Sequence, residues 1–241
     1  MEWRDEGVVL SVRKHGETSA IAEVLTAEHG RCLGLVRGGR SRVQRPVLQP
    51  GNLLQLTWRA RLDEHLGNFA VEALSLKAGA IMDDPSRLAG LSTLAGLAQL
   101  LPEREPHRRI YDALLIVLEA IEHDAPWPAL LVRWELGLLE ELGFGLDLSK
   151  CAVTGTSEDL AYVSPRTGRA VSAATGHAYR DRLLCLPPFL ISNAAAASND
   201  ELISGFRLTG HFLARHVFGP RGIQAPEQRQ WIVQSLDQTS H

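Results

Sequence analysis

Leu54-Gln55-Leu56-Thr57-Trp58-Arg59-Ala60-Arg61 is the stretch that decides the fold of the N-terminal part of the chain. Leu54, Leu56 and Trp58 alternate with polar residues, so the three apolar side chains share one face of an extended backbone. This pattern predicts a strand with one face in a core and the other in solvent. We expect Trp58 to belong to that core, and Arg59 and Arg61 to lie on the polar face.

Other short alternating runs surround this strand, at residues 8–13, 19–25, 31–36 and 69–73. Residues 26–30 end in a turn glycine and predict a hairpin loop, whereas residues 38–51 form one longer connection. Five short strands fit a small closed barrel, for which an OB-fold is the commonest choice and an SH3-like barrel the other.

The periodicity changes to a helical one after residue 76. Asp84-Pro85 predicts a helix start, since a capping residue precedes a proline in the first turn. Further helices are predicted from about Pro106, from Pro128 to Gly143, after Asp200 and after Pro226. The predicted class is α+β and multidomain, with a barrel domain at residues 1–78, a helical domain at 79–241 and an irregular insert at about 148–188.

Charge is distributed unevenly along the 241 residues, although the net charge is only −3. Residues 1–80 carry 11 basic and 9 acidic side chains, whereas residues 81–150 carry 6 and 12. This difference between blocks supports separate domains, and the acidic block suits a protein partner better than a nucleic acid.

The cysteine content and the apolar runs indicate the compartment. Cys32, Cys151 and Cys185 are odd in number and far apart, so we expect no disulfide framework and a reducing cytoplasm. No apolar run is long enough to span a membrane, and the N-terminus does not resemble a signal peptide.

A basic stretch runs from residue 31 to residue 61 without a single Asp or Glu. Guanidinium groups suit phosphate oxygens, because each group can donate bidentate hydrogen bonds and stays charged. We therefore predict DNA binding through its seven arginines, although a merely solvated loop is the alternative: Arg31, Arg37, Arg40, Arg42, Arg45, Arg59 and Arg61. Few aromatic residues accompany them, which predicts contacts to phosphates rather than stacking on bases.

Several short pieces, in this order and spacing, resemble RecO, a bacterial family of recombination mediators and DNA-repair proteins. The pieces are Gly16-Glu17-Thr18-Ser19, Leu25-Thr26-Ala27-Glu28-His29-Gly30-Arg31, Val36-Arg37-Gly38-Gly39-Arg40-Ser41-Arg42, Leu48-Gln49-Pro50, Arg133-Trp134-Glu135-Leu136, Leu142-Gly143-Phe144, Cys151-Ala152-Val153-Thr154-Gly155 and Leu186-Pro187-Pro188-Phe189.

The resemblance implies an N-terminal OB-fold, a helical domain and a zinc-finger-like insert. It also implies binding of single- and double-stranded DNA, annealing of complementary strands, and loading of recombinase onto DNA coated by single-stranded-DNA-binding protein. The implied partners are RecR and the acidic C-terminal tail of that coating protein, with Arg133 and Trp134 as the implied tail contact. A cytoplasmic, nucleoid-associated location follows.

The pattern departs from the family at the insert. A family Cys-x-x-Cys pair reads Cys151-Ala152-Val153-Thr154 here, and the second pair is missing. Structural zinc needs four nitrogen or sulfur ligands, and only His177 and Cys185 remain nearby, so we expect no metal and no cofactor.

No catalytic motif is present either. The chain contains no Gly-x-x-x-x-Gly-Lys-Ser/Thr loop and no Gly-x-Ser-x-Gly elbow. His211 and His216 are five residues apart and would not share a face of an α-helix. We expect a non-catalytic protein; the alternatives are a helical protein-interaction adaptor with incidental DNA affinity and, less favoured, a metal-dependent nuclease.

Overall fold

The computed structural model describes residues 1–62, 64–192 and 197–238. By its internal contacts the chain divides into two compact units, Met1–Ala125 and Pro126–His241. Each unit has its own set of buried apolar side chains. Among the helices that the structure describes, none combines the length and the apolar character that crossing a membrane requires.

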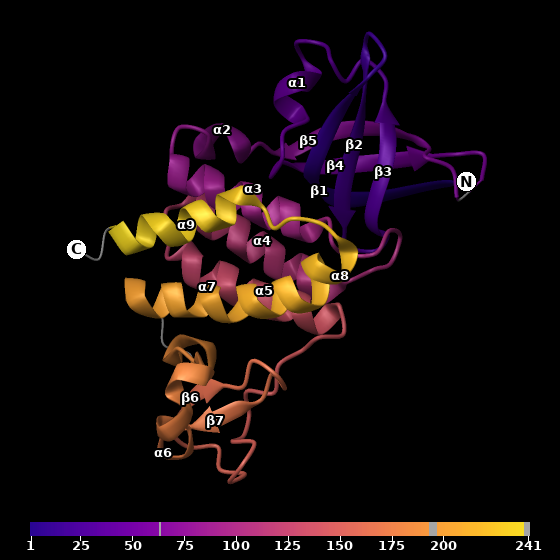
Figure 1. Cartoon of the computed structure of the whole chain (residues 1–241). Coiled ribbons are helices and arrows are strands. Elements are labelled where there is room, and N and C mark those ends of the chain that lie inside the picture. The colour runs from indigo at the N-terminus through magenta and orange to yellow at the C-terminus, as the bar shows by residue number, and fades with distance from the viewer. Residues whose placement is uncertain (63, 193–196, 239–241) are drawn as a thin grey trace. The chain divides into compact units, whose positions relative to one another are not determined.

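The first unit begins with five strands that form a closed barrel in the order β1-β2-β3-β5-β4 (Figure 1). Neighbouring strands are antiparallel, except that β3 and β5 pair in parallel. The five strands predicted from the alternation of side chains are thus confirmed: β1 (Glu2–His15), β2 (Ser19–Thr26), β3 (Gly30–Val36), β4 (Leu53–Arg59) and β5 (Asn68–Ser75).

Strand β1 is longer than the run at residues 8–13 that predicted it. Its first half pairs with β4, from Glu2 opposite Arg59, and its second half pairs with β2. The register shifts between Val9 and Ser11, and such an irregularity bends a strand. Backbone hydrogen bonds to β4 hold the polar first residues of β1. Such hydrogen bonds need no alternation of apolar side chains, so this part of the strand leaves no signal in the sequence.

The barrel core contains the side chains that the alternation placed there. Leu54, Leu56 and Trp58 are buried together with Val24 and Phe69. Trp58 is only 2% exposed and donates its indole N–H to the Leu66 carbonyl. The prediction that Trp58 is a core residue is confirmed.

Helices complete the first unit: α2 (Ala78–Ile81), α3 (Pro85–Ala98) and α4 (Arg108–Glu122). The predicted start of α3 is confirmed, because the Asp84 carboxylate accepts hydrogen bonds from the Ser86 and Arg87 amides. Leu91 of this helix is buried, whereas Leu88 is exposed.

The second unit contains α5 (Trp127–Glu141), α7 (Asn199–Leu213), a π-helical turn (Ala214–Phe218), α8 (Gly219–Arg221) and α9 (Glu227–Gln238). A buried ion pair joins α5 to α9, with Arg229 Nε 2.7 Å from Glu135 Oε1. The Thr209 hydroxyl, on α7, donates to the same carboxylate.

The predicted insert is more regular than the sequence indicated. It contains a three-stranded sheet in the order β7-β6-β8. The paired segments are short, so they lack the long alternating runs by which a strand is recognised in a sequence. Its elements are β6 (Leu160–Val163), β7 (Ala170–Ser172), α6 (Ala173–Gly176), β8 (Leu184–Cys185) and the 3-10 turns His177–Arg182 and Pro188–Leu190. The second domain is thus helical but not wholly so.

The contacts divide the chain after Ala125, whereas the predicted boundary lies after residue 78. The helices α2, α3 and α4 belong to the same unit as the barrel. Packing does not say which segment folds independently. The boundary between residues 78 and 79 therefore stays a prediction.

Candidate nucleic-acid interface

The arginine-rich connection between β3 and β4 lies against the turn between β1 and β2. The Arg40 amide donates to the Thr18 carbonyl at 3.0 Å, and the Arg40 guanidinium donates to the Gly16 carbonyl at 2.7 Å. Gly39 permits this approach, because a Cβ at that position would lie 2.9 Å from the Ala20 Cβ. Two segments that are distant in the sequence therefore form one surface at this end of the barrel.

A short helix, α1 (Gln44–Val47), gives this connection a fixed shape. The buried Asn52 side chain donates to the Pro46 and Val47 carbonyls at 2.8 and 2.9 Å. Leu48 is buried in the barrel core. The long connection is thus bound to the barrel both at the helix and on its C-terminal side.

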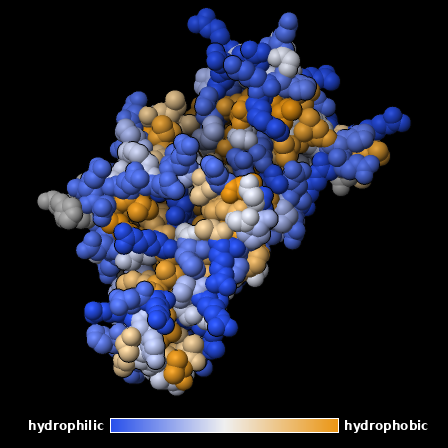
Figure 2. Space-filling view, in the orientation of Figure 1, coloured by the Kyte–Doolittle hydropathy of each residue, from blue (hydrophilic) through white to orange (hydrophobic). Residues whose placement is uncertain are grey.

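Four of the predicted arginines meet on this connection. Arg37, Arg40, Arg42 and Arg45 are exposed, and no ion pair to a carboxylate is formed by any of them within the part of the chain that the structure describes. Their charges remain available to an external anion. In Figure 2 this end of the barrel is largely hydrophilic, and an apolar area lies on the barrel wall beside it.

A pocket of about 320 Å³ opens between α1 and β1. Lys14, Arg40 and Arg45 supply cations to its lining, and Val12 and Leu48 are among its apolar side chains. Sequence reasoning missed Lys14. The signal was present, because Lys14 precedes the Gly16-Glu17-Thr18 turn that contacts the arginine connection. We call Lys14, Arg37, Arg40, Arg42 and Arg45 the α1 surface.

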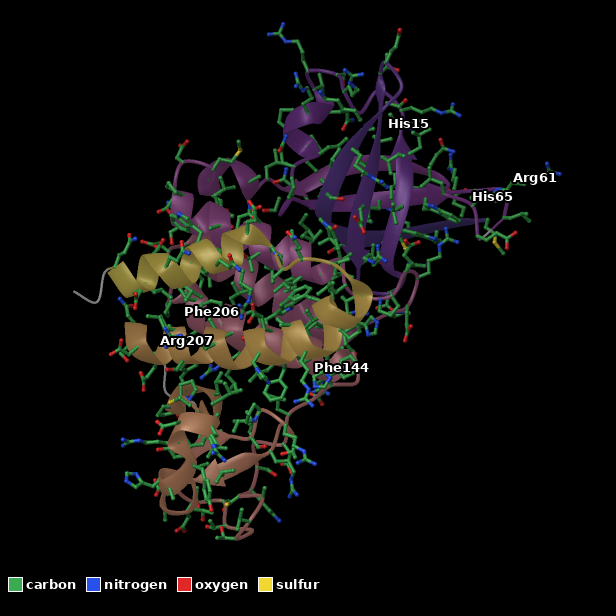
Figure 3. All side chains as sticks on the ribbon, viewed as in Figure 1. His15, Arg61, His65, Phe144, Phe206 and Arg207 are labelled. Atoms are coloured by element: carbon green, nitrogen blue, oxygen red, sulfur yellow. The ribbon has the colours of Figure 1, made fainter. Side chains whose placement is uncertain are left out.

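Arg59 and Arg61 do not extend the α1 surface. Arg59 pairs with Glu2 at the first residue of β1, whereas the α1 surface contacts the last residues of that strand. Arg59 also forms an exposed ion pair with Glu2 at 2.8 Å. Figure 3 shows Arg61 and His65 on a projection well away from His15. The structure therefore separates these two arginines from the other four.

Arg31 serves the interior of the first unit. Its guanidinium lies 2.5 Å from Glu23 and donates to the Leu101 carbonyl at 2.7 Å. Only 15% of the side chain is exposed. The charge is compensated by Glu23, so Arg31 is not included in the α1 surface.

Arg133 and Trp134, the implied contact for a partner, lie on α5 in different surroundings. Trp134 is 2% exposed and belongs to the core. The Arg133 guanidinium donates to the carbonyls of Phe189 and Ser192 at 2.7 and 3.1 Å. A pocket of about 540 Å³ adjoins it, and its apolar lining comes from other residues: Leu136, Leu146, Leu148, Phe189, Leu190 and Ile191.

The insert does not present a zinc site around Cys151. The Ser172 amide donates to Cys151 Sγ at 3.3 Å, and the Ser172 hydroxyl donates to that of Thr175 at 3.1 Å. The Thr154 hydroxyl and backbone amides nearby lower the pKa of Cys151 to about 5. Hydroxyls stand beside this thiol where zinc needs thiolates or imidazoles, so the residues do not fit a zinc ion.

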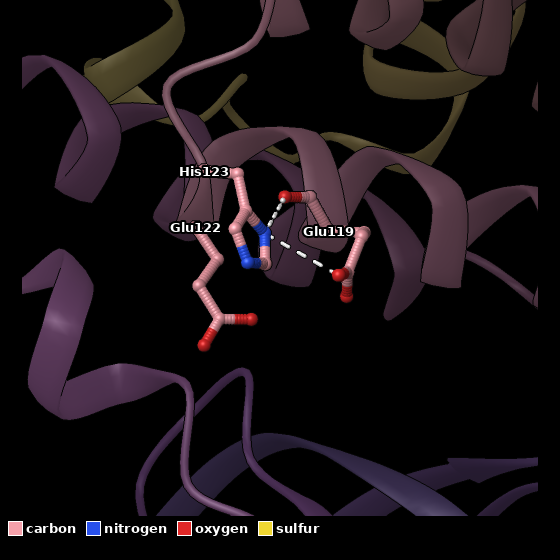
Figure 4. Close-up of side chains that lie close together, drawn as sticks. All are labelled: Glu119, Glu122 and His123. Carbon is pink, nitrogen blue, oxygen red and sulfur yellow. Dashed lines mark hydrogen bonds and ion pairs between the residues drawn. The ribbon is translucent and has the colours of Figure 1, made fainter.

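Figure 4 shows Glu119 and Glu122 of α4 with His123, the residue that follows the helix. Within the described residues this is the one group of three or more side chains that could hold a metal ion. Lys77 already contacts both carboxylates, with Nζ 2.7 Å from Glu119. His123 Nδ1 lies 3.3 Å from the Glu119 carboxylate. An internal cation thus compensates these acids, and the cluster indicates a solvated ion-pair network rather than a metal centre.

Comparisons with known proteins cover nearly the whole chain. Residues 1–76 match the family model described as "Recombination protein O N terminal", and residues 82–222 match "Recombination protein O C terminal". A protein named DNA repair protein RecO from Rhizobium etli is 52% identical over 98% of this chain and 92% of its own length. The protein of the same name from Methylobacterium nodulans is 53% identical over 97% of both chains.

The two family models together span the barrel, the whole insert and the helices α3 to α8, whereas α2 and α9 lie outside the matched ranges. Identity near one half over almost full length also extends to the RecO protein of Mesorhizobium japonicum, at 53% over 98% of this chain. The resemblance found in the short sequence pieces is therefore confirmed: the chain belongs to the RecO family of DNA repair and recombination proteins.

Proposed function

We propose that this chain is a non-catalytic DNA-binding protein of repair and recombination, which binds single- and double-stranded DNA through the α1 surface. The observation that carries the proposal is the group of exposed arginines on one fixed connection, next to Lys14 and without paired carboxylates in the described chain. Such cations bind phosphate and release counterions from DNA. The name DNA repair protein, which the relatives carry, agrees with this ligand.

The architecture of the barrel supports the same ligand. A closed five-stranded barrel with β1 between β2 and β4 favours an OB-fold over the SH3-like alternative. OB-folds are used widely to bind oligonucleotides. We infer that the α1 surface is the part of the barrel where a strand enters.

Annealing of complementary strands follows from the same surface. Two strands repel each other through their phosphates, and cations that cover phosphates lower this repulsion. The α1 surface contains no aromatic side chain, so it offers no platform on which bases could stack. The bases of a strand bound there stay available for pairing. We propose that the recombinase is loaded onto coated DNA while the strand is held by its phosphates in this way.

The salt dependence of DNA binding by the full chain tests this proposal. For a single strand, log K falls with log salt by about 0.7 for each phosphate that the protein neutralises. Replacing Arg40 and Arg42 with glutamine should therefore flatten the slope by roughly 1.4, with little dependence on base sequence. Annealing of complementary oligonucleotides should slow in the same variant.

A matched control removes two other exposed arginines of the first unit, Arg4 and Arg109, for which no carboxylate partner is found among the described residues. Arg4 pairs with Thr57 near the start of β1, at the other end of that strand from Lys14. The control should keep the slope. An unchanged slope in the folded Arg40→Gln/Arg42→Gln variant would favour the adaptor, whose acidic helical block binds a protein.

The remaining proposals concern partners and the insert. RecR and the acidic tail of single-stranded-DNA-binding protein are the partners that the resemblance implies. The pocket beside Arg133 has apolar side chains that suit the apolar end of such a tail, and Arg133 suits its acids, although Glu140 also lines the pocket. We place the protein in the cytoplasm at the nucleoid, where its DNA lies. The insert is proposed to be a zinc-finger-like module that folds without metal.

A further inference from the structure

The second unit contains another long stretch without acidic residues, from Leu202 to Pro226. It includes Arg207, Arg215 and Arg221 together with two histidines. Residues 160–180 of the insert are likewise free of Asp and Glu. In a chain with more acids than bases, two such stretches in one unit indicate a surface that favours anions.

Basic side chains follow one side of α7 and of the π-helical turn after it. Arg207, His211 and Arg215 follow one another at intervals of four residues, which places them on one side of a helix. Arg207 and Arg215 are exposed, whereas Phe206 and Phe212 on the other side are buried. Figure 3 labels Arg207 on this helix.

The insert joins its own cations to this face. The Pro165 carbonyl accepts hydrogen bonds from His211 Nε2 at 3.1 Å and from Arg215 at 2.7 Å. Arg166 follows Pro165 directly and is exposed. Neither Arg166 nor Arg207 pairs with a carboxylate in the described part of the chain. These hydrogen bonds bring the segment that carries Arg166 against the segment that carries Arg215.

Three stacked aromatic rings lie next to these basic side chains. His216 stacks on Phe144 with ring centroids 4.9 Å apart, and on Phe212 at 6.1 Å. Burial lowers the pKa of His216, and the charges of Arg215 and His211 lower it further. Phe144 is 37% exposed and forms the solvent end of the three rings.

His216 lies in the π-helical turn Ala214–Phe218. On a regular α-helix, His211 and His216 would point in different directions. Both rings contact Phe212, that of His211 edge-on with centroids 5.1 Å apart and that of His216 stacked at 6.1 Å. Single π-turns within helices occur frequently at functional sites.

We propose that Arg166, Arg207, His211, Arg215 and Phe144, which we call the α7 surface, form a second site for single-stranded DNA. The arginines hold phosphates, and the exposed ring of Phe144 stacks on a base. The inference rests on the proposed function, because it takes the same class of ligand. It differs from the α1 surface in contacting bases as well as phosphates, and it gives one chain two places to hold a strand.

The experiment measures binding of a fluorescent single-stranded oligonucleotide to the full chain across a range of salt concentrations. Arg166→Gln with Arg207→Gln should flatten the slope of log K against log salt by roughly 1.4. Arg215 is left in place because it holds the Pro165 carbonyl. The matched control, Lys150→Gln with Arg182→Gln, removes two exposed charges from the same unit and should leave the slope unchanged.

A second variant, Phe144→Leu, tests the stacking contact. Loss of one stacked base should weaken single-strand binding by about fivefold or more at every salt concentration. The salt slope and the binding of duplex DNA should stay the same, because no phosphate contact is removed. The melting temperature of each variant shows whether it has folded.

The results separate this inference from the proposed function. If Arg40→Gln/Arg42→Gln flattens the slope and Arg166→Gln/Arg207→Gln does not, the α7 surface is overturned while the α1 surface stands. If neither pair changes the slope, both fall. If the α7 surface binds an acidic peptide and not DNA, the inference is likewise overturned, in favour of a protein partner.

Discussion

The side chain of Asp5, near the start of β1, holds the loop between β2 and β3 in place by hydrogen bonds. Its carboxylate accepts hydrogen bonds from the His29 ring and the Glu28 amide, both at 3.0 Å. The His29 ring in turn stacks on Trp3, with centroids 4.1 Å apart. Burial alone would raise the pKa of Asp5, but the hydrogen bonds from His29, Glu28 and Glu6 outweigh it and hold this pKa below its usual range.

We predict that Asp5→Asn lowers the free energy of unfolding at pH 7 by about 1.5–3 kcal/mol, as is usual for hydrogen bonds to a charged group. Because the folded-state pKa is depressed, this stabilisation is present above the ordinary aspartate pKa and is lost as the pH falls through the folded value. Urea unfolding at pH 7 and near pH 3 measures the difference. Glu6→Gln, at an exposed neighbour, should cost less. An equal loss from Asp5→Asn at both pH values would contradict the assignment.

Among the elements, the insert holds hydrogen bonds around Cys151 in place of further metal-ligating side chains. Cys151 is buried, and its sulfur accepts a hydrogen bond from the Ser172 amide. The neighbouring hydroxyl of Ser172 donates a hydrogen bond to that of Thr175. The β7-β6-β8 sheet is held together by backbone pairing. The module therefore has internal interactions that do not require a metal.

We predict that the purified protein carries far less than one zinc per chain after dialysis, as measured by elemental analysis. Cys151→Ser should change the free energy of unfolding by only about 1 kcal/mol, because a single core substitution and no ligand bond is involved. Cys185→Ser, at an exposed thiol, serves as the control. One firmly held zinc per chain, lost with Cys151→Ser, would refute the metal-free insert.

At the scale of the whole molecule, the barrel depends on the helices that follow it in the first unit. The Arg31 side chain donates to the Leu101 carbonyl, and the Arg104 amide donates to the Arg31 carbonyl at 2.8 Å. Leu91 of α3 packs so closely on Gly51 that a Cβ there would lie 2.7 Å from it. A fragment that ends at residue 78 loses all these contacts.

We predict that a fragment of residues 1–125 unfolds cooperatively and that a fragment of residues 1–78 is markedly less stable. Each large apolar side chain that loses its cover costs roughly 1.5–3 kcal/mol, against a total stability of about 5–15 kcal/mol. Thermal unfolding followed by circular dichroism compares the two fragments. Equal stability would instead support an independent domain that ends at residue 78.

The sequence by itself determined the five strands, the start of α3 and the membership of the RecO family. These depend on local signals, namely the two-residue alternation around Trp58, the Asp84-Pro85 cap, and short motifs in a fixed order. Such signals act between near neighbours in the chain, so they survive without knowledge of the fold.

Only the tertiary structure decided which cations share a surface. Arg31 and Arg40 look alike in the sequence. In the structure, Arg31 forms an ion pair with Glu23 and donates to the Leu101 carbonyl, whereas Arg40 is exposed and has no carboxylate partner among the described residues. Lys14 joins Arg40 because the β1–β2 turn folds against the β3–β4 connection, whereas the register of β1 and β4 takes Arg59 elsewhere. The charge available at a surface depends on partners that are distant in the sequence, and pairing between strands selects those partners.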